Sequence, residues 1–452
     1  MISVNPYDGQ TIREYPDFTA EQTSAAVDSA EKAFFEWRGA TLTERKVLNL
    51  KLRDLLEKKK DELARLMTLE MGKPIKQSCA ELEKCGLALS YYSEKAELFL
   101  APQMVETEAQ KSYVRFDPLG LVLAVMPWNF PFWQVFRFSA PSVIAGNAAL
   151  LKHASNVTGC ALAIETLYRE AGFPENIFRT LLIPGSNVLP LMDDQRIKAA
   201  TLTGSEAAGV AIAEKAGRNL KKVVLELGGS DPFIVLGDAD IAKAAAVAAK
   251  ARTINNGQSC IAAKRFIVEQ SVYDSFRNAF VDEMNKLKVG DPLSEETDVG
   301  PLAKREFLEE LEQQVERSVK EGAIVLAGGK KPESDGWFYP PTVLGNVKPG
   351  NTAFEEEIFG PVAPLIMARD NDHAMKLANS SRFGLGGSIW TSDTQVAEKM
   401  AAELEVGTVF INGMVKSDPR LPFGGVKASG FGRELSYFGM REFVNVKTVV
   451  IE

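Results

Sequence analysis

The sequence has few histidines and few cysteines, and each shortage excludes a class of protein. Its 452 residues include only 2 His and 4 Cys. With His153 and His373 alone, no His-Glu-x-x-His zinc motif is present, and a Cys-His or Ser-His hydrolase would have to use one of these two. Neither follows the signatures of such hydrolases. Of the cysteines, only Cys260 has chemically suggestive neighbours, and the four lack zinc-ligand pairing or the density of a disulfide scaffold.

Basic runs and long apolar runs are also missing. The net charge of −8 argues against a nucleic-acid partner. The longest apolar stretches, 119–128 and 239–251, are too short or too interrupted by charge to span a bilayer. The N-terminus shows no signal-peptide pattern. We therefore expect a cytoplasmic protein, and its length suggests two or three domains.

The first hundred residues are rich in helical patterns. Apolar side chains recur at three- and four-residue spacing over 21–39, 43–67 and 74–98. The segment 104–123 alternates polar and apolar residues and predicts a hairpin. We therefore expect these segments to have a structural role and not a catalytic one.

Strand and helix patterns then alternate, which favours a parallel sheet with crossover helices and a dinucleotide-binding architecture. The expected strands are 121–126, 148–152 and 178–183, with helices over 132–145 and 159–171. No Gly-x-Gly-x-x-Gly follows a strand. Thr203–Gly209 instead opens a helix at Ala207, which fits either a phosphate-facing terminus or a plain cap.

A second α/β pattern runs from residue 228 to 429. Helices are expected over 241–255, 272–287 and 304–321. Strands are expected over 265–268, 324–327, 364–367, 388–390 and 409–412. Gly228-Gly229 is a plausible hinge between the two patterns, which would place the preceding Glu226 at a cleft.

Three polar groups in apolar or turn surroundings are catalytic candidates. Cys260 follows a Gly-containing turn and precedes a strand, so its backbone N–H could stabilise an oxyanion. Glu226 lies within an apolar run, where desolvation would raise the pKa of its carboxyl group towards that of a general base. Asn129 is the only plain polar donor in an aromatic loop. Most free thiols belong to buried structural cysteines, so the catalytic interpretation rests on the three residues together.

The chain resembles the aldehyde dehydrogenase superfamily, and within it the NADP-type succinate-semialdehyde dehydrogenases. The resemblance rests on six motifs in the family's order over most of the chain, which are Pro127–Pro131, Thr203–Ser205, Glu226–Gly229, Gly257–Cys260, Glu357–Pro361 and Pro422–Gly425. It implies an α/β fold with a Rossmann-type cofactor domain (1–100 and 119–227), an α/β catalytic domain (228–429) and a small β oligomerisation element (101–118 and 430–452). It also implies a homodimer or homotetramer, with 443–451 as the partner strand of the hairpin.

The resemblance assigns roles to the three candidates. Cys260 would add to an aldehyde carbonyl, with the oxyanion held by Asn129 and the Cys260 N–H. Glu226 would activate the water that hydrolyses the thioester. Residues expected to bind the cofactor are Trp128, Lys152, Ser155, Gly185, Ser205, Glu357 and Phe359. A second cysteine two residues after the nucleophile, which forms a disulfide switch in some relatives, is absent because Ala262 stands there.

One departure from the family pattern concerns the cofactor. Where relatives often read Lys-Pro-Ser-Glu, this chain reads Lys152-His153-Ala154-Ser155. A carboxylate at the last position would repel a 2′-phosphate, whereas Ser155 donates to one and Lys152 supplies positive charge. We therefore predict NADP in preference to NAD.

Arg137 indicates which kind of substrate the protein binds. It lies eight residues after Asn129, about two helical turns on, and an arginine in an aromatic tunnel could pair with a substrate carboxylate. An arginine that extends to the surface or bonds a carbonyl group is the competing interpretation. By family alignment Trp133, Ser259, Ser417 and Phe423 would face the same tunnel. Succinate semialdehyde is the best single substrate, and glutarate semialdehyde fits nearly as well.

Three alternatives stay open at this point. The chain could be a broad-specificity aldehyde dehydrogenase in which Arg137 is structural. It could be a non-catalytic binding or structural protein of the same fold, although Cys260, Glu226 and Asn129 argue against that. It could also be a thiol-dependent esterase that needs no cofactor.

Overall fold

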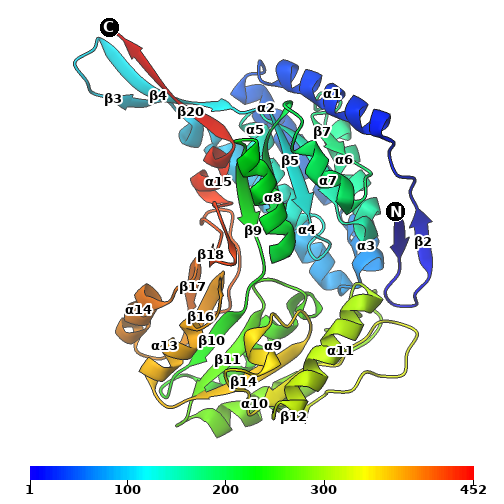
Figure 1. Ribbon diagram of the computed structural model, residues 1–452, viewed down its shortest axis with the longest axis vertical. Coiled ribbons are helices and arrows are strands. Elements are labelled where there is room, and N and C mark those ends of the chain that lie inside the picture. The colour runs from blue at the N-terminus through cyan, green and yellow to red at the C-terminus, as the bar shows by residue number, and fades with distance from the viewer.

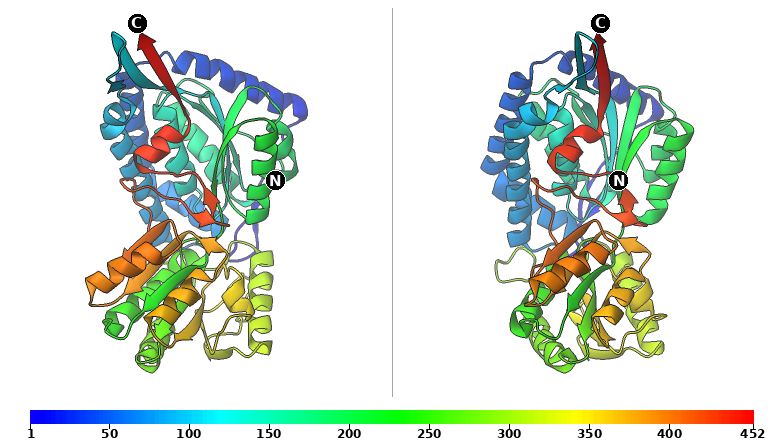
Figure 2. Two further views of the ribbon diagram at one scale, coloured as in Figure 1. Left: turned by 60° about the vertical axis from the view of Figure 1, so that its left-hand side comes forward. Right: turned by 90° about the vertical axis from the view of Figure 1, so that its left-hand side faces the viewer.

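The computed structural model describes residues 1–452 and has two lobes with a projecting β arm (Figure 1). Each lobe is built on one large sheet, of six strands in one lobe and seven in the other. The carboxyl ends of the parallel strands of the six-stranded sheet face the junction of the lobes, and the amino ends of several strands of the seven-stranded sheet face it from the other side (Figure 2). Ligands of open α/β sheets bind at the carboxyl ends of the strands.

The first sheet has the order β19-β9-β8-β5-β6-β7. Its strands are β5 (Leu121–Met126), β6 (Ala148–His153), β7 (Phe178–Thr180), β8 (Ile197–Thr203), β9 (Lys222–Glu226) and β19 (Gly430–Phe431). The pairs among β5 to β9 are parallel, and β19 adds an antiparallel edge. The central strands are buried on both faces, which explains their continuous apolar runs. The crossover helices are α5 (Trp133–Ile144), α6 (Thr158–Glu170), α7 (Val188–Leu191) and α8 (Glu206–Arg218).

The alternation predicted for this sheet is confirmed, with one strand shortened. The strand expected over 178–183 ends at Thr180, where β7 stops pairing with β6. α8 begins one residue before the expected Ala207.

The helical layer holds α1 (Ala20–Trp37), α2 (Leu42–Lys58), α3 (Lys60–Met71) and α4 (Ile75–Leu100). The prediction of one helix over 43–67 is wrong. The backbone leaves the helical region at Lys59, with φ −99° and ψ 11°, so two helices form. Capping boxes begin α1 at Thr19 and α2 at Thr41, as their Thr-x-x-Gln and Thr-x-x-Glu sequences favour.

The second sheet has the order β12-β13-β14-β11-β10-β16-β17. Its strands are β10 (Asp231–Val235), β11 (Ala263–Glu269), β12 (Ile324–Ala327), β13 (Thr342–Gly345), β14 (Val362–Ala368), β16 (Gly386–Trp390) and β17 (Thr408–Ile411). All its pairs are parallel except β12 with β13. The surrounding helices are α9 (Ile241–Thr253), α10 (Tyr273–Asn285), α11 (Arg305–Lys320), α12 (Thr352–Glu355), α13 (Asn371–Asn379) and α14 (Thr394–Glu403).

The helix predicted over 241–255 ends two residues early. Asn255 and Asn256 adopt left-handed φ values of 55° and 58°, and Gly257 follows at 75°. Asparagine and glycine are the residues that tolerate this region best. The left-handed turn breaks the helix and directs the chain to Cys260.

The arm is a three-stranded antiparallel sheet of β3 (Gln103–Val105), β4 (Lys111–Pro118) and β20 (Val444–Ile451). It projects from the end of the first lobe that lies away from the second (Figure 1). The predicted hairpin and its C-terminal partner strand are therefore present. The range 104–123 was too long, because Leu121 already begins β5 of the large sheet.

Short elements complete the fold. β1 (Ile2–Val4) and β2 (Thr11–Glu14) form an N-terminal hairpin, and β15 (Phe383–Gly384) pairs with β18 (Val426–Lys427). The helix α15 (Ser436–Glu442) contacts α4 and α5. The structure contains no helix that has both the length and the apolar character needed to cross a bilayer.

Candidate active site

Cys260 lies where two cavities meet. One cavity, of about 400 Å³, is bordered by Trp128, Glu357 and Phe359. The other, of about 690 Å³, is bordered by Trp133 and Ser417. Cys260 borders both, so its half-buried side chain is reachable from two directions.

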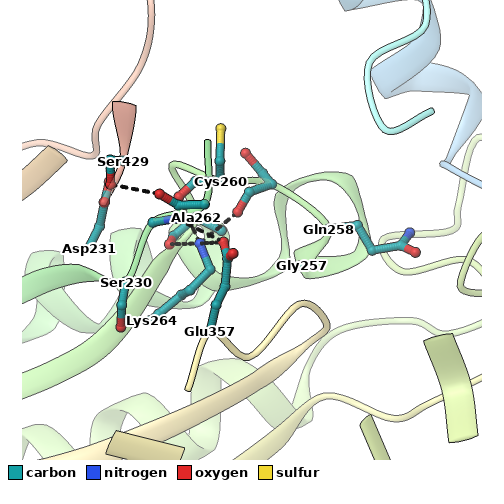
Figure 3. A network of polar contacts seen from close by, with 12 residues as sticks. Ser230, Asp231, Gly257, Gln258, Cys260, Ala262, Lys264, Glu357 and Ser429 are labelled. Atoms are coloured by element: carbon teal, nitrogen blue, oxygen red, sulfur yellow. Dashed lines mark hydrogen bonds and ion pairs between the residues drawn. The ribbon is translucent and has the colours of Figure 1, made fainter. Parts of the chain in front are cut away.

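A buried lysine holds the loop that carries this cysteine. Lys264, at the start of β11, donates from Nζ to the carbonyl oxygens of Ser259 at 2.8 Å and Cys260 at 2.7 Å. The same ammonium group lies 3.2 Å from Glu357 Oε1. Figure 3 shows these contacts converging beneath the loop, with the Cys260 sulfur pointing away from them. The loop is thus fixed from behind and leaves the sulfur exposed to the cavities.

Two hydrogen-bond donors are available beside the sulfur. The Asn129 side chain is buried and donates from Nδ2 to the Gln258 carbonyl oxygen at 3.1 Å, which leaves its second amide hydrogen free. Asn255 Nδ2 donates to the Asn129 carbonyl oxygen at 2.7 Å and fixes that loop to the left-handed turn. The Cys260 backbone N–H donates to no other protein atom. A pair of such free donors suits a developing oxyanion.

The Cys260 thiol is neutral at rest. Burial raises the pKa of the thiol to about 12, although the positive charges of Lys264 and Arg137 act to lower it. A sulfur nucleophile reacts as the thiolate. Turnover therefore requires the thiol to lose its proton.

Glu226 ends β9 and is 2% exposed. Neither of its carboxylate oxygens has a hydrogen-bond partner in the protein. Burial raises its pKa well above the usual range, against a lowering effect of Arg137. An unpaired carboxyl group with a raised pKa has the properties that a general base needs, as the apolar run in the sequence predicted.

The first cavity has the lining of a nucleotide cleft. Trp128 stacks on Phe307 at 4.7 Å between ring centroids and meets Phe359 edge-on at 5.8 Å. Glu357 accepts a hydrogen bond from the Gly229 N–H at 3.1 Å and is held by Lys264. Predicted Trp128, Glu357 and Phe359 therefore come together, and Ser205 lines the same cavity.

The remaining cofactor candidates follow neighbouring strands. Lys152 is in β6 with no acidic partner, and burial, then the charge of Lys304, lowers its pKa. Ser155 lies two residues beyond β6, half-buried, with no partner for its hydroxyl group. Gly185 follows β7, and a Cβ there would meet no atom within 4 Å.

Ser205 instead accepts a hydrogen bond from the Ala208 N–H at 3.3 Å and caps α8. Its hydroxyl group therefore has a structural function, one of the two interpretations of this motif. A dinucleotide that carries a 2′-phosphate fits the groups gathered here, which are an unpaired lysine, a free serine hydroxyl, a capped helix terminus and a carboxylate at the lobe junction.

Arg137 borders the second cavity, in an arrangement that the sequence did not predict. Its guanidinium forms an ion pair with Glu434, both side chains being almost fully buried. Nη2 also donates to Thr203 Oγ1 at 3.2 Å, whereas Nη1 donates to no protein atom. Its guanidinium carbon lies 4.8 Å from the centre of the Phe423 ring. Trp133, Ser259, Ser417 and Phe423 line this cavity too, and the buried Ser259 hydroxyl has no partner.

The helix that carries Trp133 and Arg137 is capped from another helix. α5 has no side-chain cap of its own. Glu81 of α4 accepts from the N–H groups of Phe132 and Trp133, both at 2.8 Å. Glu81 is in turn paired with the buried Lys73.

Both histidines have structural roles. His153 Nε2 donates to the Pro131 carbonyl oxygen at 2.9 Å, and Nδ1 accepts from the Ala154 N–H at 3.0 Å. His373 accepts from the Arg369 N–H at the start of α13. Both histidines are engaged by backbone atoms, so neither is placed as the base of a hydrolase.

Sequence reasoning missed four residues of this site, which are Lys84, Lys264, Phe307 and Glu434. Only Lys264 left a local signal, since a lysine in the apolar strand after the cysteine needs a buried partner. The other three come from a helix or loop distant in sequence, and no motif marks them.

Comparisons with known proteins agree with this geometry. The profile of the aldehyde dehydrogenase family matches residues 1–449. A probable NADP(+) succinate-semialdehyde dehydrogenase of Synechocystis is 51% identical, over 100% of this chain and 99% of the relative. A succinate-semialdehyde dehydrogenase [NADP(+)] of Mycobacterium leprae is 47% identical over the same shares. The crystal structure of succinic semialdehyde dehydrogenase from Streptococcus pyogenes with NADP+ superposes with a TM-score of 0.97, at 36% identity, covering 100% of this chain and 99% of that one.

Proposed function

This chain belongs to the aldehyde dehydrogenase family, and on that premise we propose that it oxidises succinate semialdehyde to succinate with NADP. One observation carries the proposal: the Cys260 side chain borders both a cavity lined for a nucleotide and a cavity lined by cationic and hydroxyl groups. The names of the relatives in Synechocystis and Mycobacterium leprae support the same substrate and cofactor. Glutarate semialdehyde is the nearest alternative substrate.

The reaction begins at sulfur. The Cys260 thiolate adds to the aldehyde carbonyl carbon, and the carbonyl oxygen becomes an oxyanion. The free amide hydrogen of Asn129 and the Cys260 N–H donate to this oxygen. Removing one such donor typically costs about 100- to 1,000-fold in turnover.

The cofactor cleft orients the redox step. When bound, NADP accepts the hydride that leaves the former carbonyl carbon. We propose that Glu357 bonds the nicotinamide ribose, while Trp128 and Phe359 form the walls beside the ring. Lys264 keeps the Glu357 carboxylate at a fixed distance from the Cys260 loop.

Hydrolysis of the remaining thioester is assigned to Glu226. Its carboxylate would take a proton from a water molecule that attacks the acyl carbon, and succinate then leaves. The absence of any hydrogen-bond partner leaves this side chain free to reorient towards the acyl group. Burial keeps its pKa high enough to return the proton.

The preference for NADP is assigned to Lys152 and Ser155. Lys152 has no acidic partner and Ser155 has a free hydroxyl group, so both would donate to a 2′-phosphate. Gly185 and Ser205 would lie along the same groove, with the α8 terminus towards the pyrophosphate.

The substrate is proposed to lie against Trp133 and Phe423, with its polar groups towards the hydroxyls of Ser259 and Ser417. Arg137 offers its free Nη1 to the substrate, while Glu434 holds the rest of the guanidinium in place. A catalytically silent protein of this fold, or a broad-specificity enzyme, would not need these cavity-facing polar groups.

We further propose that the protein acts as a homodimer or homotetramer in the cytoplasm. The outer strand β20 exposes Val446, Val450 and Ile451 on the projecting arm, and both arm edges lack partners. All four cysteines are unpaired, as in a reducing compartment. The division into a cofactor domain (1–100 and 119–227), a catalytic domain (228–429) and an oligomerisation element (101–118 and 430–452) is part of this proposal.

An aldehyde panel with both cofactors tests the function. Purified protein should reduce NADP fastest with succinate semialdehyde, more slowly with glutarate semialdehyde, and poorly with butanal. Cys260→Ala should lose this activity, whereas Cys79→Ala, a change at a half-buried thiol that lines neither cavity, should keep it. Equal rates with butanal and succinate semialdehyde would contradict the proposed substrate, and ester hydrolysis without reduction of NADP would point to an esterase.

A further inference from the structure

The second cavity contains a lysine whose charge is not balanced by an acid. Lys84 lies on α4 and lines the cavity together with Trp133, Ser417 and Cys260. Its Nζ donates a hydrogen bond to Ser417 Oγ at 2.6 Å and lies 4.3 Å from the centre of the Trp133 ring. No ion pair joins it to any carboxylate, in contrast to Lys76 on the same helix, which pairs with Asp298 at 2.7 Å.

Arg137 has a charge that is already balanced by an acid. Its Nε faces Glu434 and its Nη2 donates to Thr203, which leaves Nη1 as the nitrogen without a protein partner. A substrate carboxylate that met Arg137 alone would compete with a buried carboxylate for one positive charge. The cavity needs a second cation to favour an anionic substrate. Of the lining lysines without an ion pair, Lys250 and Lys416 are exposed, and Lys84 is the half-buried one, beside a hydroxyl group.

We propose that Lys84 and Ser417 bind the far carboxylate of the aldehyde substrate and thereby select short aldehydes that end in a carboxylate. The inference rests on the proposed function, because it names the group that recognises that substrate. It adds Lys84 to the substrate residues expected from the sequence.

The geometry suits a carboxylate. An ammonium group has three donors, and only one is used by Ser417. Because Ser417 accepts that bond through its oxygen, its own O–H hydrogen is free to donate to the same ligand. Both donors are therefore close enough together to bind one carboxylate in the cavity. The Trp133 ring beside the ammonium keeps the charge in place and limits its hydration.

The burial of the site strengthens the interaction. Burial, followed by the positive charge of Arg137, lowers the pKa of Lys84 to about 8. A protonated lysine in this position is under-solvated, so a carboxylate ligand replaces water at a smaller cost of desolvation. Charge-assisted hydrogen bonds of this kind are the stronger class in proteins.

A comparison of two substrates tests this inference. The full-length enzyme is assayed with NADP and either succinate semialdehyde or butanal, which has the same chain length and no carboxylate. For Lys84→Met, kcat/KM with succinate semialdehyde should fall about 10- to 100-fold, mainly through KM, and kcat/KM with butanal should stay within about twofold. Lys84→Arg should retain most of the preference.

Lys95→Met is the matched control. Lys95 lies on the same helix, outside both cavities, and pairs with Glu94 at 2.6 Å. The Lys95→Met substitution removes the same formal charge and should change kcat/KM for neither substrate. If Lys84→Met fails to fold, Lys84→Gln and Lys84→Arg carry the same comparison, with butanal turnover as the measure of an intact site.

The outcomes separate this inference from the proposed function. Unchanged preference in Lys84→Met, or an equal loss with both aldehydes, would overturn the role of Lys84 while the proposed activity stands. A wild-type enzyme without preference for succinate semialdehyde over butanal would overturn the proposed function itself. A loss of preference confined to Lys84 variants supports both.

Discussion

Lys264 and Glu357 form an ion pair of 3.2 Å directly beneath the loop that presents Cys260. The same ammonium donates to the carbonyl oxygens of Ser259 and Cys260, and Glu357 also accepts from the Gly229 N–H. The nucleophile loop and the carboxylate proposed to hold the nicotinamide ribose are thus fixed by one buried side chain.

Lys264→Met should damage both stability and cofactor binding. Loss of the ammonium leaves two carbonyl groups and the Glu357 carboxylate without their buried partner, at a cost of about 3–5 kcal/mol of unfolding free energy. Urea denaturation and the KM for NADP should both report the change. Lys243→Met, which removes an exposed charge from α9, serves as the control. A variant with wild-type stability and wild-type KM for NADP would show that the pair is dispensable.

Ser155→Glu should shift the cofactor preference towards NAD. A carboxylate two residues beyond β6 repels a 2′-phosphate and accepts a hydrogen bond from a ribose 2′-hydroxyl group. The ratio of kcat/KM for NADP to that for NAD should fall by at least about tenfold, since a charge-assisted bond is replaced by repulsion. Ser155→Ala, which only removes the hydroxyl donor, should lower the ratio less. A wild-type enzyme that prefers NAD would refute the assignment of Ser155.

The preference for succinate semialdehyde should depend on pH through Lys84. Burial and then the charge of Arg137 lower the pKa of Lys84 to about 8, while Cys85, Glu81 and Asp418 oppose the shift. Above that pH the lysine becomes neutral and no longer attracts a carboxylate. The ratio of kcat/KM for succinate semialdehyde to that for butanal should therefore fall by up to about tenfold per pH unit between pH 8 and 10.

The comparison of two substrates cancels the titration of Cys260, which affects both aldehydes alike. Lys84→Arg should remove the pH dependence of the ratio, because arginine remains charged throughout this range. A ratio that stays constant from pH 7 to 10 in the wild type would contradict the role of Lys84.

His153 should make the protein sensitive to mild acid. Burial lowers the pKa of its imidazole from 6.5 to about 4, so the unfolded chain binds a proton that the folded chain does not in that interval. Stability is fully present above pH 6.5 and falls as the pH drops towards 4, by roughly 3 kcal/mol for this residue. Thermal melts of the wild type and His153→Gln between pH 4.5 and 7.5 measure this loss of stability. The variant should show a smaller loss in acid, and parallel curves would exclude the contribution of His153.

The sequence predicted those parts of the molecule that depend on local pattern. The apolar runs of β5 and β6 and the helix at Ala207 appear within about one residue of their expected positions. The motif residues Cys260, Asn129 and Glu357 also meet at the lobe junction, because each follows or precedes an element of recognisable period. The break at Lys59 was missed because the helical spacing of apolar residues continues across it.

Long-range polar contacts were beyond the reach of the sequence. Glu434 is separated from Arg137 by almost three hundred residues, and Lys84 from Ser417 by more than three hundred. No spacing rule connects such positions, so neither the paired state of Arg137 nor the unpaired lysine beside Ser417 could be predicted. Both arise only when α4, α5 and the C-terminal loops pack around one cavity.

The acyl-enzyme provides the most direct measurement of the central claim, that Cys260 carries the substrate and Glu226 releases it. Glu226→Gln should form the thioester with one equivalent of NADPH and then turn over slowly, by about 100- to 10,000-fold, for want of a base. After rapid quenching with succinate semialdehyde and NADP, mass spectrometry should find a succinyl group on the peptide that contains Cys260. A burst of NADPH without this adduct, an adduct on another cysteine, or an undiminished steady-state rate would contradict the account.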